Sequence, residues 1–166
     1  CILMCLSMAS MGSALSITNG DFEALGVRED VPNWFDYTVG AGGAAGQTYL
    51  RLLNSPTGTQ YMGFDNDDCW AYQSIGFNTG GLPALQIQYD IGRVTNAEET
   101  RDLVLTISIY ESDGSFAGSD GPDSSDIDGA AGVTLIDSVT VSYPAVNPGQ
   151  AVTDAVTLQY LNAAGG

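Results

Sequence analysis

The chain has 166 residues, and its 44% hydrophobic content is enough for the core of one two-layer domain. Its 20 acidic and 4 basic residues give a formal net charge of −16, which disfavours nucleic acid and anionic membrane surfaces as partners. Histidine is absent, which excludes histidine-dependent catalytic triads and zinc sites built on histidine, whereas a carboxylate site for a hard cation stays open.

Residues 1–16 form an uncharged apolar tract that ends in small residues and is typical of an export signal. Ala14 and Ser16 stand where a signal peptidase would recognise them, so the expected mature domain covers residues 17–166. The tract is too short to span a membrane as an ordinary helix, and no later segment is long and apolar enough. We therefore expect a secreted or cell-surface protein without membrane insertion. A hydrophobic N-terminal strand or helix is the alternative interpretation of the same tract.

Apolar residues alternate with polar ones between Gly, Asn, Asp and Pro turns, which predicts an all-β domain, and helix signals are nearly absent. A first strand is expected at residues 17–23, and further strands at 47–53, 59–64, 68–77, 85–91, 102–111, 132–143 and 150–161. In three of them the alternation assigns apolar side chains to one inward face. These side chains are Leu85, Ile87, Tyr89 and Ile91, then Leu103, Leu105, Ile107 and Ile109, and finally Val152, Val156, Leu158 and Tyr160.

The segment 68–77 carries the best candidates for ligand binding. Alternation places Asp68, Trp70 and Tyr72 on one face of the strand, with the two aromatic side chains ~7 Å apart. Flat rings beside carboxylates and amides suit a sugar, because the rings stack on its C–H groups and the polar groups bind its hydroxyls. We therefore predict that Asp68, Trp70 and Tyr72 bind a glycan or polysaccharide. In the alternative interpretation Trp70 and Tyr72 pack under a loop or in the other half of the domain.

Two acidic segments are candidates for binding a cation. Asn19, Asp21 and Glu23 bring side-chain oxygens to one short segment, as a calcium ion with its six to eight oxygen ligands requires. The long loop at 113–132 contains Asp126 and Asp128 in half of a calcium-loop pattern, but the closing Glu is absent. We interpret that loop as a solvated acidic segment.

Residues 19–23, Asn-Gly-Asp-Phe-Glu, followed by Trp34, resemble the N-terminal signature of secreted carbohydrate-binding-module-like jelly rolls with the galactose-binding-like fold. Residues 58–62, 72–75 and 89–93 are similar to further motifs of that family, in the same order. The resemblance implies a jelly-roll-like β-sandwich of two antiparallel sheets and a structural calcium with Glu23 as a ligand. The family's last strand, which supplies an Asp ligand, has no match here. We therefore expect the domain to be truncated at its C-terminal strand.

The resulting expectation is a secreted, non-catalytic carbohydrate-binding-like or cell-surface domain, stabilised by calcium and without catalytic residues. One alternative is a structural or adhesive subunit of an extracellular assembly that self-associates through an open sheet edge. A second alternative is a calcium-dependent enzyme of the cyclase type with the same fold. In that case Asp68 beside Tyr72 would supply the acid.

Overall fold

The computed structural model describes residues 2–5, 20, 34–38, 49–51, 55–56, 61–63, 69–76, 84–116 and 127–159. Every regular element in this part of the chain is a β-strand, so the all-β prediction is confirmed. The strands are β1 (Ile2–Cys5), β2 (Phe35–Thr38), β3 (Tyr49–Arg51), β4 (Tyr61–Gly63), β5 (Cys69–Tyr72), β6 (Ala84–Gly92), β7 (Arg101–Ser112), β8 (Val133–Val146) and β9 (Ala151–Gln159). A helix long and apolar enough to cross a membrane is not found among the described residues.

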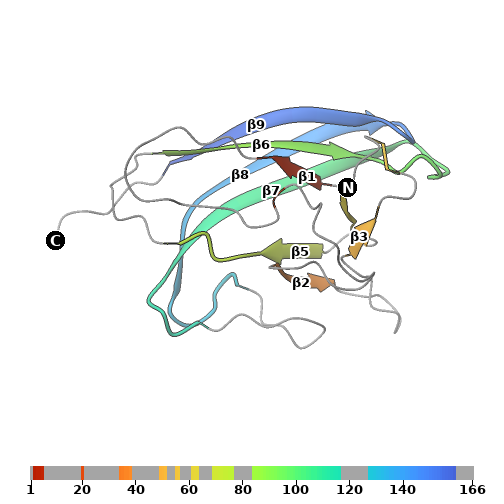
Figure 1. Cartoon of the computed structure of the whole chain (residues 1–166). Helices are drawn as coiled ribbons and strands as arrows, with labels where there is room; N and C mark the ends of the chain where they lie inside the picture. The colour runs from red at the N-terminus through yellow and green to blue at the C-terminus, as the bar shows by residue number, and fades with distance from the viewer. Residues whose placement is uncertain are drawn as a thin grey trace.

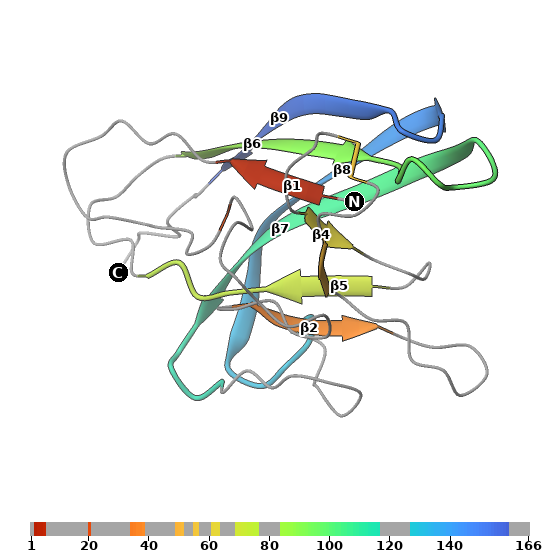
Figure 2. The same cartoon turned by 45° about the vertical axis from the view of Figure 1, so that its right-hand side comes forward.

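The strands form one five-stranded sheet and two strand pairs, and all the pairings are antiparallel (Figure 1). The larger sheet has the order β3-β4-β1-β6-β9, while β2 pairs with β5 and β7 pairs with β8. The long β7–β8 hairpin runs behind the larger sheet in both views (Figures 1 and 2).

The core lies between the β7–β8 hairpin and the two strands β6 and β9. All four predicted inward residues of β6 are buried, and Leu158 of β9 is fully enclosed at 0% exposure. From the hairpin, Leu105, Ile109 and Tyr143 belong to the same buried cluster. The predicted inward faces of these strands are therefore confirmed within the described residues; Tyr160 lies outside them. Period-two alternation worked here because each strand has one face on the core and one on solvent.

A chain of hydrogen bonds crosses this core. Tyr143 of β8 donates its hydroxyl proton to Asp154 Oδ2 at 2.8 Å, and the hydroxyls of Tyr89 and Tyr143 lie 2.5 Å apart. A phenol has one proton, so Tyr89 must be the donor to Tyr143. Burial, together with the bonds to Tyr89 and Asp154, raises the pKa of Tyr143. The bond from Tyr143, followed by that from the Ala155 N–H, lowers the pKa of Asp154, so the folded state favours its ionised form.

Two strands were not among the predicted ones. β2 has only four residues, too few for a clear period, and β1 lies within the tract that resembles an export signal. In the 166-residue chain β1 pairs with residues 88–91 of β6 and with Met62 of β4. The pairing agrees with the alternative interpretation of this tract as a strand, and cleavage of an export signal stays a prediction.

Candidate functional site

Four aromatic side chains gather around β5, and we call Phe35, Trp70, Tyr72 and Phe116 the aromatic cluster. Trp70 and Tyr72 lie on the same face of β5, with ring centroids 5.3 Å apart and planes inclined by 32°. Phe35 is the register partner of Tyr72 on β2 and stacks on its ring at 5.3 Å and 27°. Phe116, which lies a few residues after β7, contacts Tyr72 of β5, with 5.9 Å between the two ring centroids. All four side chains are partly buried.

The predicted alternation along β5 explains this arrangement. Trp70 and Tyr72 share a face as expected. Ile75, which follows β5 at an odd-numbered position, packs against the core instead. Of the predicted ligand-binding residues, Asp68 lies outside the described residues. The predicted calcium ligands Asn19, Asp21 and Glu23 lie outside them as well. Trp34, directly before β2, is partly buried.

The sequence prediction missed two members of the aromatic cluster. Phe35 could have been identified only from the pairing of β2 with β5, two segments separated by more than 30 residues. Phe116 belongs to the loop that was interpreted as a solvated acidic segment, and its single aromatic residue was the available signal. Of the first four residues of that loop, 113–116, Phe116 is partly buried against Tyr72, whereas residues 113–115 are exposed.

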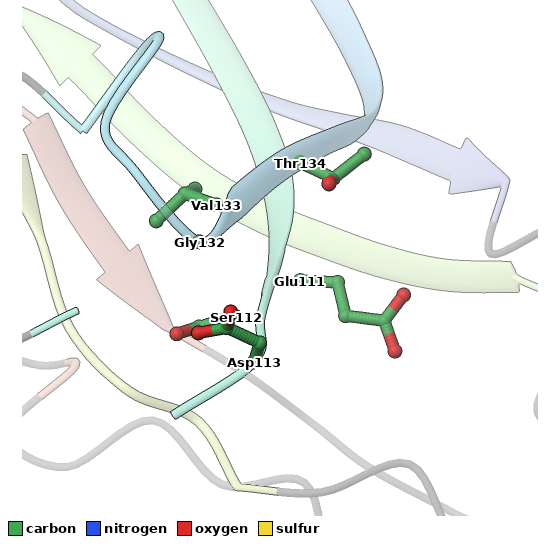
Figure 3. A pocket seen from close by; sticks show the side chains of 6 residues that line it. All are labelled: Glu111, Ser112, Asp113, Gly132, Val133 and Thr134. Carbon is green, nitrogen blue, oxygen red and sulfur yellow. The ribbon is translucent and has the colours of Figure 1, made fainter. Parts of the chain in front are cut away.

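A shallow pocket of about 310 Å³ opens at the end of the β7–β8 hairpin (Figure 3). It is lined by Glu111, Ser112, Asp113, Gly132, Val133 and Thr134, and we call it the hairpin pocket. The Asp113 N–H donates to the Gly132 carbonyl at 2.9 Å, which closes the hairpin at this end. Register pairing sets Glu111 opposite Thr134 and Ser112 opposite Val133. The pairing of β7 with β8 thus fixes these hydroxyls and carboxylates at the end of β7 and the start of β8.

Asp113 is fixed by the residues that follow it. Its Oδ1 accepts the Ser115 N–H at 2.8 Å, and hydrogen bonds from the Ser115 side chain and then its backbone lower the pKa of Asp113. Gly132, at φ 75°, faces this turn, and a Cβ there would collide with the Asp113 carboxylate and the Ser115 hydroxyl. The positive φ favours glycine here, and any larger residue would also require the exposed Asp113 and Ser115 side chains to shift.

The two carboxylates of the hairpin pocket do not converge. Figure 3 shows the Glu111 and Asp113 side chains pointing to opposite sides of the strand end. In the described part of the chain no group of three or more Asp, Glu, Cys or His side chains could hold a metal ion. The hairpin pocket thus offers separate negative charges instead of a cage for one cation.

The aromatic cluster and the hairpin pocket are neighbours along the chain. Asp113 lines the pocket and Phe116 contacts Tyr72, so only three residue steps separate the two features. Three steps of chain span at most ~11 Å between Cα atoms. Phe116 of the aromatic cluster therefore lies close to the hairpin pocket.

No protein-family model, curated protein or solved structure matches this chain. Partly exposed rings, hydroxyls and ionised carboxylates are the groups that bind hydroxyl-rich ligands in proteins.

Proposed function

We propose that this chain is a secreted, non-catalytic glycan-binding domain. The observation that carries the proposal is the aromatic cluster, in which Trp70 and Tyr72 share one face of β5 beside the hairpin pocket. The face of an aromatic ring is electron-rich, and the C–H groups on a sugar ring carry a small positive charge, so the two stack favourably. The carboxylates and hydroxyls of the pocket would then accept and donate hydrogen bonds to the sugar hydroxyls.

We further propose that the fold is a jelly-roll-like β-sandwich. The support is the position of the core between the β7–β8 hairpin and the strands β6 and β9, with every pairing antiparallel. Antiparallel strands that bury one face each and meet across one core are the arrangement of a sandwich. The N-terminal sequence signature that includes Asn19 and Glu23 supports the galactose-binding-like variant of this architecture.

Replacing Trp70 with alanine should weaken glycan binding by at least about tenfold, or about 1.4 kcal/mol, because large aromatic side chains dominate binding energy at such sites. Tyr72→Ala should act in the same direction, while Trp70→Phe should keep part of the affinity because a stacking ring remains. The measurement is depletion of the protein from solution by a panel of insoluble polysaccharides, followed by calorimetry with a soluble fragment of the best one.

Val104→Ala is the control, since Val104 is an apolar side chain with 66% exposure near the start of β7, outside the aromatic cluster. It should bind as the wild type does. Wild-type affinity in both Trp70→Ala and Tyr72→Ala would refute the site. Failure of the unaltered protein to bind any glycan, together with self-association at modest concentration, would instead favour a structural subunit of an extracellular assembly.

We also propose that calcium stabilises the domain through Asn19, Asp21 and Glu23. If these residues bind calcium only in the folded state, calcium at a hundred times its Kd adds about 2.7 kcal/mol to the free energy of unfolding. Chelation with EDTA should then lower the melting temperature by roughly 5–10 °C. Glu23→Gln should melt at the lower temperature with or without EDTA, whereas the exposed Glu98→Gln should still respond. A melting temperature that EDTA leaves unchanged would reject the calcium proposal.

A further inference from the structure

We propose that the glycan bound at this site is cationic, a polymer of amino sugars whose ammonium groups are protonated. The inference depends on the glycan-binding function proposed above and specifies the class of ligand. Three observations support it, namely the charge of the hairpin pocket, the distance of the basic residues from it and the direction of its carboxylates.

The hairpin pocket carries negative charge, and no basic side chain that the structure describes lies at it. Glu111 and Asp113 are both exposed, and none of the six lining residues is basic. The Ser115 hydrogen bonds that lower the pKa of Asp113 keep this carboxylate ionised at neutral pH and below. The site also belongs to a chain of formal charge −16, whose field attracts cations and repels anions. A glycan that carries uronate or sulfate groups would meet this repulsion.

The basic residues whose side chains the structure describes lie at the far end of the hairpin. Arg101 begins β7 and Ser112 ends it, a separation of about 36 Å at ~3.3 Å per residue. Arg101 pairs with Glu99 at 3.6 Å, and Arg93 donates to the Glu99 carbonyl at 3.1 Å. A distance of several Debye lengths removes their influence on the pocket at physiological ionic strength.

The directions of the two carboxylates favour a polymer over a single metal ion. Since Glu111 and Asp113 point to opposite sides, they cannot surround one ion, but they can each pair with a different ammonium group (Figure 3). An amino-sugar polymer presents one such group on every sugar unit. The rings of Trp70 and Tyr72, a few sugar units away at most, can add stacking and cation–π attraction.

The test compares one polysaccharide in two forms, a soluble glucosamine polymer and the same polymer after N-acetylation. The acetylated form keeps the sugar rings and hydroxyls but loses the positive charges. At low salt the unaltered protein should bind the glucosamine polymer at least about tenfold more tightly than its acetylated form. The difference should shrink as salt is added, because exposed charge pairs are screened.

Two double variants with the same net charge separate a local effect from the general field. Glu111→Gln with Asp113→Asn should remove most of the preference for the charged polymer. Glu98→Gln with Glu99→Gln, two exposed carboxylates at the other end of the hairpin, should keep it. Glu111→Gln alone serves as a second test, since Asp113 also organises a turn. Melting temperatures check that each variant is folded.

Equal binding of both polymer forms would overturn the proposal, and so would an equal loss of preference in the two double variants. One outcome would separate the two proposals: the unaltered protein binds both polymer forms equally, and Trp70→Ala abolishes binding of the acetylated form. That outcome would support the glycan-binding function and reject the cationic ligand. If Trp70→Ala changes nothing with either polymer, the proposed function falls together with this inference.

Discussion

Replacing Gly92 with alanine is expected to lower the free energy of unfolding by about 3 kcal/mol, the upper part of the usual range for an overpacked site. Gly92 ends β6 opposite Ala151 at the start of β9. A Cβ at this position would collide with the Gln150 carbonyl oxygen and lie 2.9 Å from the Ala151 Cα. Both are backbone atoms, so no rotation of a side chain can relieve the contact. Urea unfolding followed by circular dichroism measures the loss.

Gly114→Ala provides the matched control for this prediction. Gly114 has φ 88° and no atom within 4 Å of the added Cβ, so its substitution tests conformational strain without a clash. We expect a loss of about 1 kcal/mol there. An equal decrease in the free energy of unfolding in Gly92→Ala and Gly114→Ala would show that the close approach of β6 and β9 does not affect stability. The hydrogen bond from the Arg93 N–H to Gln150 O at 3.0 Å, which holds the two segments together, should weaken in Gly92→Ala.

The longer strands were predictable because their faces have different environments. Each of the seven strand ranges predicted from residue 47 onward contains or overlaps a strand of the structure, and the inward residues of β6 were all assigned correctly. The first predicted strand, 17–23, lies outside the described residues except for Gly20. What the alternation could not reveal is the irregularity within a strand. The register of β7 and β8 shifts between Arg101 and Leu103, where Ala145 adopts φ 54° and its N–H donates to Asp102 Oδ1 at 2.8 Å. That bulge depends on a contact between residues more than 40 positions apart.

The candidate site was predictable only in its local part. Period two was enough to place Trp70 and Tyr72 on one face of β5, since neighbouring side chains on a strand depend on backbone geometry alone. The contributions of Phe35 and Phe116 depend on which segments come together, and a short strand such as β2 carries too little pattern to predict its partner. The hairpin pocket was hidden for the same reason. Its residues are the last two of β7, the first two of β8, and Asp113 and Gly132 at the two ends of the loop 113–132.

Replacing Tyr143 with phenylalanine is expected to lower the free energy of unfolding by about 2 kcal/mol. Tyr143 is the middle member of the hydrogen-bonded chain from Tyr89 to Asp154, so its hydroxyl serves two partners. Without it, the hydroxyl of Tyr89, a side chain with 1% exposure, has lost its acceptor inside the core. A buried donor without a partner is more destabilising than the loss of an exposed hydrogen bond. Urea denaturation of the single and double variants measures these differences.

Because Tyr89 donates to Tyr143 and Tyr143 donates to Asp154, the two single variants and the double variant should lose different amounts of free energy of unfolding. Tyr89→Phe should lose only about 1 kcal/mol, because Tyr143 keeps its own bond to Asp154. The double variant Tyr89→Phe with Tyr143→Phe should lose less free energy of unfolding than the two single losses added together. Its stability should equal or exceed that of Tyr143→Phe alone. Removing both hydroxyls leaves no buried donor without an acceptor, and coupled neighbours are non-additive. Additive losses would show that Tyr89 finds another acceptor, and the chain between β6, β8 and β9 would then not act as a unit.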